Sequence, residues 1–216
     1  MNVKRQAAGR LSRAEGKART RARLLDAGER VFAAQGFHAA TVEDIADAAG
    51  FTRGAFYANF ADKADLLLTL LDERSRIDME ELVDRLAAPS VDHGLGALLE
   101  WFEETFAAPS PLDRAVAEFV PVAAREPAHA DRMRRRLRRV REQVTTIVED
   151  ECAQAGFVLS IPAARFATMI IAVVDGLAAL HRLDPVAAPA ELLPETLACL
   201  GEGLATRGEV ADGGAR

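Results

Sequence analysis

The stretch GFTRGAFYANFADK, residues 50–63, places small residues directly before a cluster of aromatic residues. Three aromatic side chains fall within the five positions from Phe56 to Phe60. Aromatic side chains favour a protein core, whereas small side chains allow another molecule to approach the backbone closely. The stretch therefore predicts a short helix with one buried face and one face that a partner can approach.

A second short helix is expected immediately before this stretch, in the segment TVEDIADAAG of residues 41–50. Thr41 can cap its start, with Asp44 three residues later in a capping-box arrangement. Gly50 can end this helix, and Thr52 can then cap the next one. Two short helices joined by a tight glycine turn are therefore predicted.

A longer helix is expected before these two, from a cap at Thr20 to Gln35, with Gly36 as its stop. Its apolar stripe contains Val31 and Phe32 at helical spacing. The two phenylalanines of the third helix are four residues apart, so they share a face and can pack on this stripe. The resulting order of helices is that of a helix-turn-helix DNA-binding unit.

The exposed residues of the third helix suit the surface of DNA. The free N–H groups and the Thr52 hydroxyl at its start favour a phosphate. Arg53 can contact a guanine edge or a phosphate, and Tyr57 offers a phenol to a phosphate. Lys63 follows the cap residue Asp62 and so lies at the positive end of a helix dipole. A cation is unfavourable there unless a phosphate binds beside it. A solvated lysine paired with Asp62 is the alternative.

The charge of the chain is concentrated unevenly. Residues 1–23 contain eight Lys or Arg residues and one acid, although the whole chain has a formal net charge of −6. A basic end on an acidic protein suggests a polyanionic partner for that end, and a solvated tail is the alternative. Residues 1–18 are expected to form a flexible basic arm, and residues 207–216 a frayed tail.

The segment TVEDIADAAGFTRGAFYANFADKADLL, residues 41–67, resembles the TetR family of bacterial transcriptional regulators. The family pattern T-x-x-x-I-A-x-x-A-G-[hydrophobic]-[ST]-x-G-x-[aromatic or aliphatic]-Y-x-x-F-x-x-K-x-x-L is met at every position, and the resemblance extends back to about residue 19. Asn59 departs from the histidine that the family very often has. The resemblance implies a homodimer that inserts two copies of the third helix into a near-palindromic double-stranded DNA operator. The DNA contacts implied by position are Thr41, Thr52, Arg53, Gly54, Ala55, Tyr57, Asn59 and Lys63.

The expected fold is all-α, with two domains. Residues 19–66 form the helix-turn-helix DNA-binding domain, and residues 67–206 form a larger helical domain for effector binding and dimerisation. A fourth helix, capped by Asp62, is expected to run to about Leu86, with inward leucines and Ile77. Beyond it, helices broken by proline are expected over residues 92–107, 111–125, 127–155, 162–182 and 189–206.

The resemblance also implies a small-molecule effector, of unknown identity and expected to be largely apolar, that releases a repressor from its operator. Aromatic residues of the acidic part of the chain can line a pocket for it, and an ordinary core is the alternative. The candidate pocket residues are Trp101, Phe102, Phe106, Phe119, Phe166 and Met169.

The segment FATMIIAVVDGLAAL, residues 166–180, is apolar nearly all round and is expected to be buried on several sides. Asp175 interrupts it and can either hold a cationic ligand or play a structural part, since the Asp-Gly-Leu sequence resembles a family feature near the dimer interface. This helix and the last one are expected to form a dimeric four-helix bundle. The candidate interface residues are Asp175, Gly176, Leu177, Leu180, Leu193, Leu197 and Leu200.

Other classes of function remain to be weighed. The arginine-rich residues 131–142 can form a solvated helix back, or a patch for a membrane surface or another polyanion. An enzyme, a metal or a cofactor is not expected, because the four histidines are scattered and no phosphate-binding glycine loop is present. Cys152 and Cys199 are interpreted as buried structural thiols. Without an apolar leader or a sufficiently long apolar run, the protein is expected to be cytoplasmic, with no membrane partner.

Overall fold

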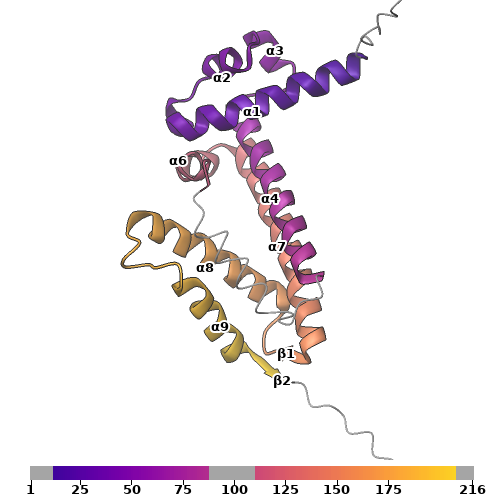
Figure 1. The fold of residues 1–216 in the computed structure, drawn as a ribbon, viewed down its shortest axis with the longest axis vertical. Coiled ribbons are helices and arrows are strands. Elements are labelled where there is room, and N and C mark those ends of the chain that lie inside the picture. The colour runs from indigo at the N-terminus through magenta and orange to yellow at the C-terminus, as the bar shows by residue number, and fades with distance from the viewer. Residues whose placement is uncertain (1–11, 88–109, 208–216) are drawn as a thin grey trace, which may run out of the picture. The chain divides into compact units, whose positions relative to one another are not determined.

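The computed structural model describes residues 12–87 and 110–207, in which the chain folds as two compact units (Figure 1). The first unit comprises described residues up to Asp72 together with Pro111–Asp131, and the second comprises the remainder. The elements in chain order are α1 (Arg13–Ala39), α2 (Val42–Ala49), α3 (Arg53–Tyr57), α4 (Lys63–Ala87), α6 (Asp113–Ala123), α7 (Pro127–Ala155), β1 (Phe157–Leu159), α8 (Ala163–Leu183), α9 (Leu192–Leu204) and β2 (Ala205–Arg207). The expected all-α fold is confirmed, except for the two short strands.

The first helix begins earlier than the sequence predicted. Ser12 is its cap, and Ser12 and Glu15 form a reciprocal capping box. Thr20, the expected cap, lies within the helix and donates its hydroxyl to the Gly16 carbonyl over 3.1 Å. The prediction of a cap at Thr20 was therefore wrong, and residues 13–18 are helical rather than part of an arm. Residues 1–11 lie outside the described part of the chain.

The core of the first unit is built around α1. Figure 1 shows α2 and α3 on one side of α1 and α6 on the other. Phe32, Phe56 and Phe60 are buried, as the spacing predicted. Gly28 permits the close approach of α4, because a β-carbon there would lie 2.4 Å from a methyl carbon of Leu66. A larger residue would therefore force the two helices apart or displace a buried leucine.

Helix α6 belongs to this first unit, although the sequence prediction assigned residues 67–206 to a single effector domain. Phe119 is fully buried, with its ring centroid 4.9 Å from that of Phe37 at the end of α1. Its ring also meets His129 edge-on at 5.9 Å. The aromatic contact with α1 explains why a segment distant in sequence joins the N-terminal helices.

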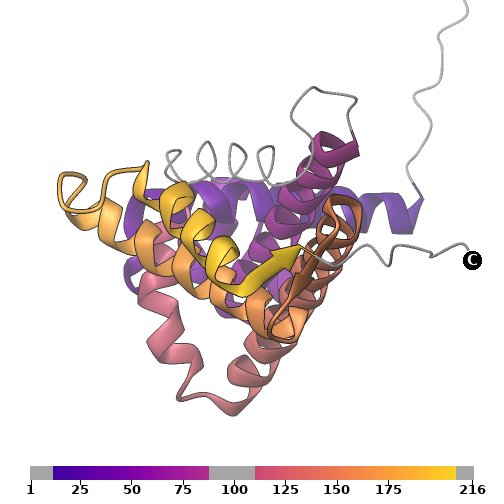
Figure 2. The same cartoon turned by 90° about the horizontal axis from the view of Figure 1, so that it is seen from below.

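The second unit contains a separate apolar core, formed by parts of α4, α7, α8 and α9. Helix α9 lies alongside α8 (Figure 1 and Figure 2). The fully or nearly buried residues of this core include Leu82, Val144, Phe166, Ile170, Leu193 and Leu197. Ile77 was expected to face inward with the leucines of α4, but its exposed fraction is 50%. That expectation was wrong for the isolated chain.

The two strands pair antiparallel, with Phe157 opposite Arg207 and Leu159 opposite Ala205. The sequence analysis predicted no strand here. Gly156 adopts a positive φ of 69°, which ends α7 and turns the chain into β1. The strand pair thereby joins the end of α7 to the end of α9.

Helix α8 differs from two expectations. It is long and apolar enough to cross a membrane by length and composition, with a mean hydropathy of 1.7, whereas no such segment was expected. Only 17% of its apolar window is buried in the single chain, although burial on several sides was predicted. A helix that packs against another copy of its chain passes the same test, so these two properties alone do not indicate a membrane span.

Candidate nucleic-acid interface

The two short helices are connected by a turn whose caps match the sequence prediction. Thr41 caps α2, accepting from the Asp44 N–H and donating its hydroxyl to the Asp44 carboxylate over 2.6 Å. Gly50 adopts a left-handed conformation, and its N–H bonds to carbonyls of the last turn of α2. Thr52 then caps α3 by accepting from the Ala55 N–H over 3.3 Å. These local bonds set the direction in which α3 leaves the turn.

Most of the predicted DNA contacts lie on the outer surface of this turn. Phe56 is fully buried and fixes one side of α3 against the core. Ala55 is half-buried beside it. The exposed members of the predicted set are Thr41, Thr52, Arg53, Gly54 and Tyr57. The helix therefore presents hydroxyl, guanidinium and phenol groups around a glycine.

Gly54 has no packing role among the residues that the structure describes. A β-carbon there would meet only the Thr52 hydroxyl, at an ordinary contact distance of 3.7 Å, and the backbone at this residue has no positive φ. Gly28, by contrast, is required by the packing of Leu66. Glycine within a helix lowers stability by about 0.5–1 kcal/mol relative to alanine. The absence of a side chain at position 54 thus leaves open space at the surface of α3, whereas its absence at position 28 is filled by Leu66.

The Asn59 side chain is turned back toward α3, which ends two residues earlier. Its side-chain N–H donates to the Ala55 carbonyl over 2.8 Å, and its backbone carbonyl accepts from Arg21 over 3.1 Å. The Asn59 Oδ1 atom is buried without a hydrogen bond among the described residues. The predicted phosphate contact at this residue stays a prediction, and the observed contacts give Asn59 a part in ending α3.

Lys63 is bound to the end of α1. Its ammonium donates to the carbonyls of Phe37, His38 and Ala40 over 2.7, 3.2 and 2.8 Å, and it lies 4.6 Å from the centre of the Phe37 ring. Burial lowers its pKa, against the opposing effect of the Glu118 charge. Because the ammonium of Lys63 donates to three carbonyls, the side chain fixes the connection between α1 and α2. Its predicted phosphate contact is untested.

Asp62 caps α4 as predicted, but it does not pair with Lys63. Its Oδ1 accepts from the Asp65 N–H over 2.7 Å, and its Oδ2 lies 3.1 Å from Nε2 of His129. The alternative of a solvated lysine paired with Asp62 is therefore wrong. His129 instead connects the cap of α4 to the start of α7 within the first unit.

Two arginines of α1 support the turn, and sequence reasoning missed both. Arg21 stacks over Phe60, with its guanidinium carbon 4.3 Å from the ring centre. Arg23 donates to the Ala49 carbonyl at the end of α2 over 2.7 Å and stacks over Phe51 at 4.8 Å. A cation at a helix C-terminus satisfies an unpaired carbonyl and complements the helix dipole. The only feature of the sequence that could have indicated this supporting role is their position directly before the apolar stripe of α1.

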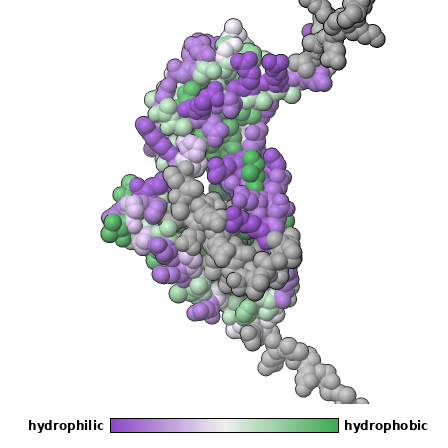
Figure 3. Space-filling view, viewed as in Figure 1, coloured by the Kyte–Doolittle hydropathy of each residue, from purple (hydrophilic) through white to green (hydrophobic). Residues whose placement is uncertain are grey.

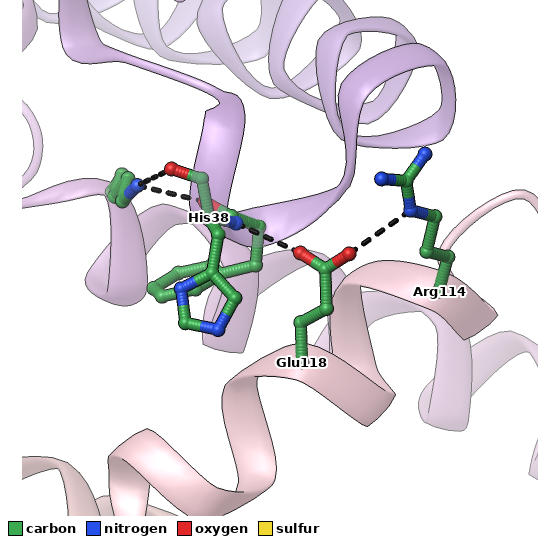
Figure 4. Close-up of polar contacts among 5 residues, drawn as sticks. His38, Arg114 and Glu118 are labelled. Carbon is green, nitrogen blue, oxygen red and sulfur yellow. Dashed lines mark hydrogen bonds and ion pairs between the residues drawn. The ribbon is translucent and has the colours of Figure 1, made fainter.

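A polar cluster of Glu118, His38 and Arg114 fixes the bend near the end of α1 (Figure 4). Gly36 has a φ of 77°, and a β-carbon there would lie 2.7 Å from the Glu118 carboxylate. Glu118, on α6, accepts from the His38 N–H and from Arg114, each over 2.9 Å. The His38 N–H is the main reason that the pKa of Glu118 is lowered, and Arg114 adds to it. The carboxylate thus binds the backbone just before the cap of α2.

The candidate effector residues within the described part of the chain belong to two different units. Trp101, Phe102 and Phe106 lie outside the described residues. Phe119 is part of the aromatic core of the first unit, whereas Phe166 and the half-buried Met169 belong to α8 in the second. A surface hollow of about 460 Å³ in the second unit is lined by Arg76, Met79, Glu80, Val83, Asp84 and Gln143. Phe119, Phe166 and Met169, the candidates within the described residues, are not among its lining residues.

The candidate dimer residues divide into two groups. Leu193 and Leu197 are buried in the core of their own chain, and Leu177 and Leu200 pack partly against it. Asp175, Gly176 and Leu180 are exposed, and the apolar surface continues to Leu183 and Val186, whose exposed fractions are 83% and 91%. Figure 3 shows hydrophobic residues gathered at the surface where α8 ends.

Asp175 remains partly accessible, yet the surrounding atoms raise its pKa by desolvation, against the lowering effect of Arg136 and Arg182.

No group of three or more side chains able to hold a metal occurs among residues 12–87 and 110–207. Cys152 is half-buried and Cys199 is exposed, so the expectation of burial was wrong for Cys199.

The arginine-rich segment lies within α7. Val144 and Val148 on one face of this helix are buried, and Arg136 donates to the Ser75 hydroxyl of α4 over 2.5 Å. Arg135 and Arg138 are exposed on the outer side. This distribution agrees with the solvated back of a packed helix, and no observation favours the membrane alternative.

Comparisons with known proteins agree with the helix-turn-helix geometry. Residues 24–70 match the bacterial regulatory proteins of the tetR family, and residues 94–207 match the C-terminal part of BetI-type transcriptional repressors. The HTH-type transcriptional regulator TtgR of Pseudomonas putida is 44% identical over 71 residues, which are 33% of this chain and 31% of that protein. The matched region thus spans about a third of this relative.

Solved structures share the fold over most of their length. The regulator FadR of Bacillus subtilis in complex with stearoyl-CoA has a TM-score of 0.67 and 18% identity, over 84% of this chain and 98% of that one. A putative regulator of Saccharomonospora viridis in complex with choline also has a TM-score of 0.67, with 19% identity, over 88% and 100%. Since the second family match alone covers more than half of the sequence, this chain belongs to the tetR family of bacterial regulatory proteins.

Proposed function

We propose that this protein is a transcriptional repressor that binds a double-stranded DNA operator through the exposed face of α2 and α3. The observation that carries the proposal is Gly54, a helical glycine with open space above it that no packing contact within residues 12–87 and 110–207 requires. A major groove admits a helix, and a missing side chain lets the helix backbone approach the groove wall. Membership of the tetR family supports the same assignment.

The exposed side chains around Gly54 have distinct parts in this proposal. Arg53 reads a guanine through its two parallel donors, because this is the commonest specific contact of an arginine in the major groove. Tyr57, Thr41 and Thr52 offer hydroxyl groups to phosphates, which set the register of the protein on the duplex. Ala55 lies beside them on the half-buried side of α3.

We further propose that the operator is bound by a homodimer formed through α8. Exposed leucine and valine side chains at the end of this helix gain free energy when a second copy covers them. A two-fold dimer presents two copies of α3, which matches a near-palindromic operator. Leu193 and Leu197 then support the interface from within each chain, because they are already buried.

The proposed effector is a small, largely apolar molecule that binds in the second unit and releases the DNA. The apolar core around Phe166 supports a ligand of this kind. Met169, a second candidate, is partly buried on the same helix. The two neighbouring structures hold an acyl-CoA and choline, which are chemically unlike each other at the same level of fold similarity. The fold therefore leaves the class of effector open, and the proposal of an apolar effector rests on the apolar character of the second unit's core.

The DNA-binding proposal is tested by fluorescence anisotropy with DNA that flanks the protein's own gene, over a series of salt concentrations. We expect Arg53→Ala and Tyr57→Ala to weaken binding by about 10-fold or more, since each removes a direct contact. Arg135→Ala on the exposed back of α7 removes one positive charge elsewhere and should bind like the wild type. Equal loss in all three variants, or weak and sequence-independent binding by the wild type, would refute the assignment of α3 as the DNA-reading helix.

A further inference from the structure

The DNA-facing arginine of α3 is held by a carboxylate of α2. Arg53 Nη1 lies 2.7 Å from Glu43 Oε1, and the two side chains are 60% and 50% exposed. The two residues come from opposite sides of the turn at Gly50. This ion pair therefore joins the two helices of the helix-turn-helix on the surface proposed to meet DNA.

The guanidinium of Arg53 is also restrained from its other side. Its central carbon lies 6.0 Å from the centre of the Tyr57 ring, within the range of a cation–π contact. A hydrogen bond with Tyr57 and the charge of Glu43 both raise the pKa of Arg53. An arginine side chain has many rotamers when free, and two partners reduce that number before any ligand arrives.

This pair has little effect on folding. Ion pairs between exposed side chains contribute little to stability, because water and salt screen them. A carboxylate on a DNA-binding surface also repels phosphates, so Glu43 weakens binding to every DNA sequence. An acidic residue at such a place needs a compensating benefit, and the orientation of Arg53 provides one.

We infer that Glu43 is a specificity-determining residue that positions Arg53 for base reading, an inference that rests on the proposed DNA-binding function. With Glu43 in place, the guanidinium is directed along the surface of α3 and is kept from swinging to a nearby phosphate. DNA that presents a guanine to Arg53 recovers the energy lost by repulsion, and other DNA does not. The carboxylate thus lowers non-specific binding more than operator binding.

The test compares the affinity for two duplexes of equal length. One is an operator that the wild type selects from random-sequence DNA, and the other is a scrambled sequence; their ratio of dissociation constants measures specificity. We expect Glu43→Gln to bind the scrambled duplex about 5-fold more tightly and to change operator affinity little, so that the specificity ratio falls about 5-fold. In an Arg53→Ala background, Glu43→Gln should leave the ratio unchanged.

Asp47→Asn is the matched control. Asp47 is an exposed acid one turn further along α2, on the same side as Glu43, and it makes no ion pair within residues 12–87 and 110–207. Its loss should tighten binding to both duplexes by the same factor and leave the ratio unchanged. Melting temperatures of both variants should stay close to that of the wild type.

Each other outcome contradicts the inference in a distinct way. A ratio unchanged by Glu43→Gln, as in the control, would reduce Glu43 to an ordinary surface charge while the proposed DNA-binding function stands. A lower ratio that persists in the Arg53→Ala background would mean that Glu43 contacts a base itself, and the positioning role would be overturned. A wild type that binds both duplexes alike would overturn the proposed function and this inference with it.

Discussion

The exposed face of α2 and α3 is polar, whereas the exposed end of α8 is apolar. A partner that covers each surface therefore changes the stability of the protein to a different extent. Around Gly54, water solvates hydroxyl and guanidinium groups well, so this face is stable alone and its partner can leave. At Leu183 and Val186, water is in contact with large hydrocarbon side chains, so a partner that covers them stabilises the protein. The difference indicates a reversible contact at one surface and a lasting one at the other.

The two surfaces also differ in how they are supported. The polar face rests on α1 through contacts to backbone atoms, in which Arg23 binds the end of α2 and Lys63 binds the end of α1. The end of α8 is held mainly by short-range bonds: Asp184 accepts from the N–H groups of Val186 and Ala187 over 3.1 Å each, and His181 Nδ1 lies 2.7 Å from the Ala188 carbonyl oxygen. Helix α9 packs alongside α8. The experiments below disturb one surface at a time, beginning with the largest expected effect.

Loss of the buried anchor of α3 should remove the polar face altogether. Phe56 is fully buried, so Phe56→Ala should lower the free energy of unfolding by about 3–5 kcal/mol. Urea denaturation followed by circular dichroism measures this change. Tyr57→Ala, a neighbouring aromatic residue that is half exposed, should have a much smaller effect on stability. Equal stability of the two variants would mean that α3 is not anchored as described.

A charge at the apolar end of α8 should separate the dimer without unfolding the chain. Leu180→Glu combined with Leu183→Glu buries two carboxylates in the proposed interface, and we expect dimerisation to weaken by about 100-fold or more. Analytical ultracentrifugation over a range of protein concentrations measures the dissociation constant. Leu137→Glu, at an exposed leucine of α7, is the control and should leave the dimer intact. A double variant that still sediments as a wild-type dimer would exclude α8 as the interface.

The support of the polar face should depend on pH through Glu118. Its pKa is lowered from the ordinary value of 4.5, so the native state favours the ionised carboxylate. The resulting stabilisation is complete above that ordinary value and is lost as the pH falls through the lower native pKa. We therefore expect Glu118→Gln to be less stable than the wild type at about pH 7, and the difference to shrink in acid.

Urea denaturation at several pH values measures this difference. Glu73→Gln, on α4 and outside the cluster, gives the baseline for the loss of one negative charge. A gap between the wild type and Glu118→Gln that widens as the pH falls would have the wrong sign, and it would contradict the bonding of Glu118 to His38.

The sequence predicted the polar face far better than the rest of the molecule. The caps at Thr41, Thr52 and Asp62 and the stop at Gly50 are local signals, since each depends on residues within three or four positions. The burial of Phe56 followed from helical spacing in the same way. Such features are visible in the sequence because the interacting groups are close along the chain.

Contacts between distant segments were not predictable on the same basis. Glu118 lies 80 residues from His38, and no spacing rule connects α6 to the bend at Gly36. Lys63 was expected to bind phosphate, yet its side chain reaches back to carbonyls more than 20 residues earlier. The strand pair of Phe157 and Arg207 likewise required the packing of the second unit. Polar groups that satisfy distant backbone atoms have no sequence signature.

The most direct test of the central claim compares two glycines with opposite roles. Gly54→Ala places a methyl group in open space on α3 and should raise the free energy of unfolding by about 0.5–1 kcal/mol. Gly28→Ala places one against Leu66 in the core and should lower it by about 1–3 kcal/mol. Thermal unfolding and operator binding are measured on the same samples of both variants.

If the exposed face of α3 is shaped for a DNA groove, Gly54→Ala will be at least as stable as the wild type and will bind its operator about 10-fold more weakly. Gly28→Ala will be less stable, and the fraction that remains folded will bind with wild-type affinity. Undiminished operator binding by Gly54→Ala would contradict the account, because the open space above this glycine would then have no part in contacting DNA.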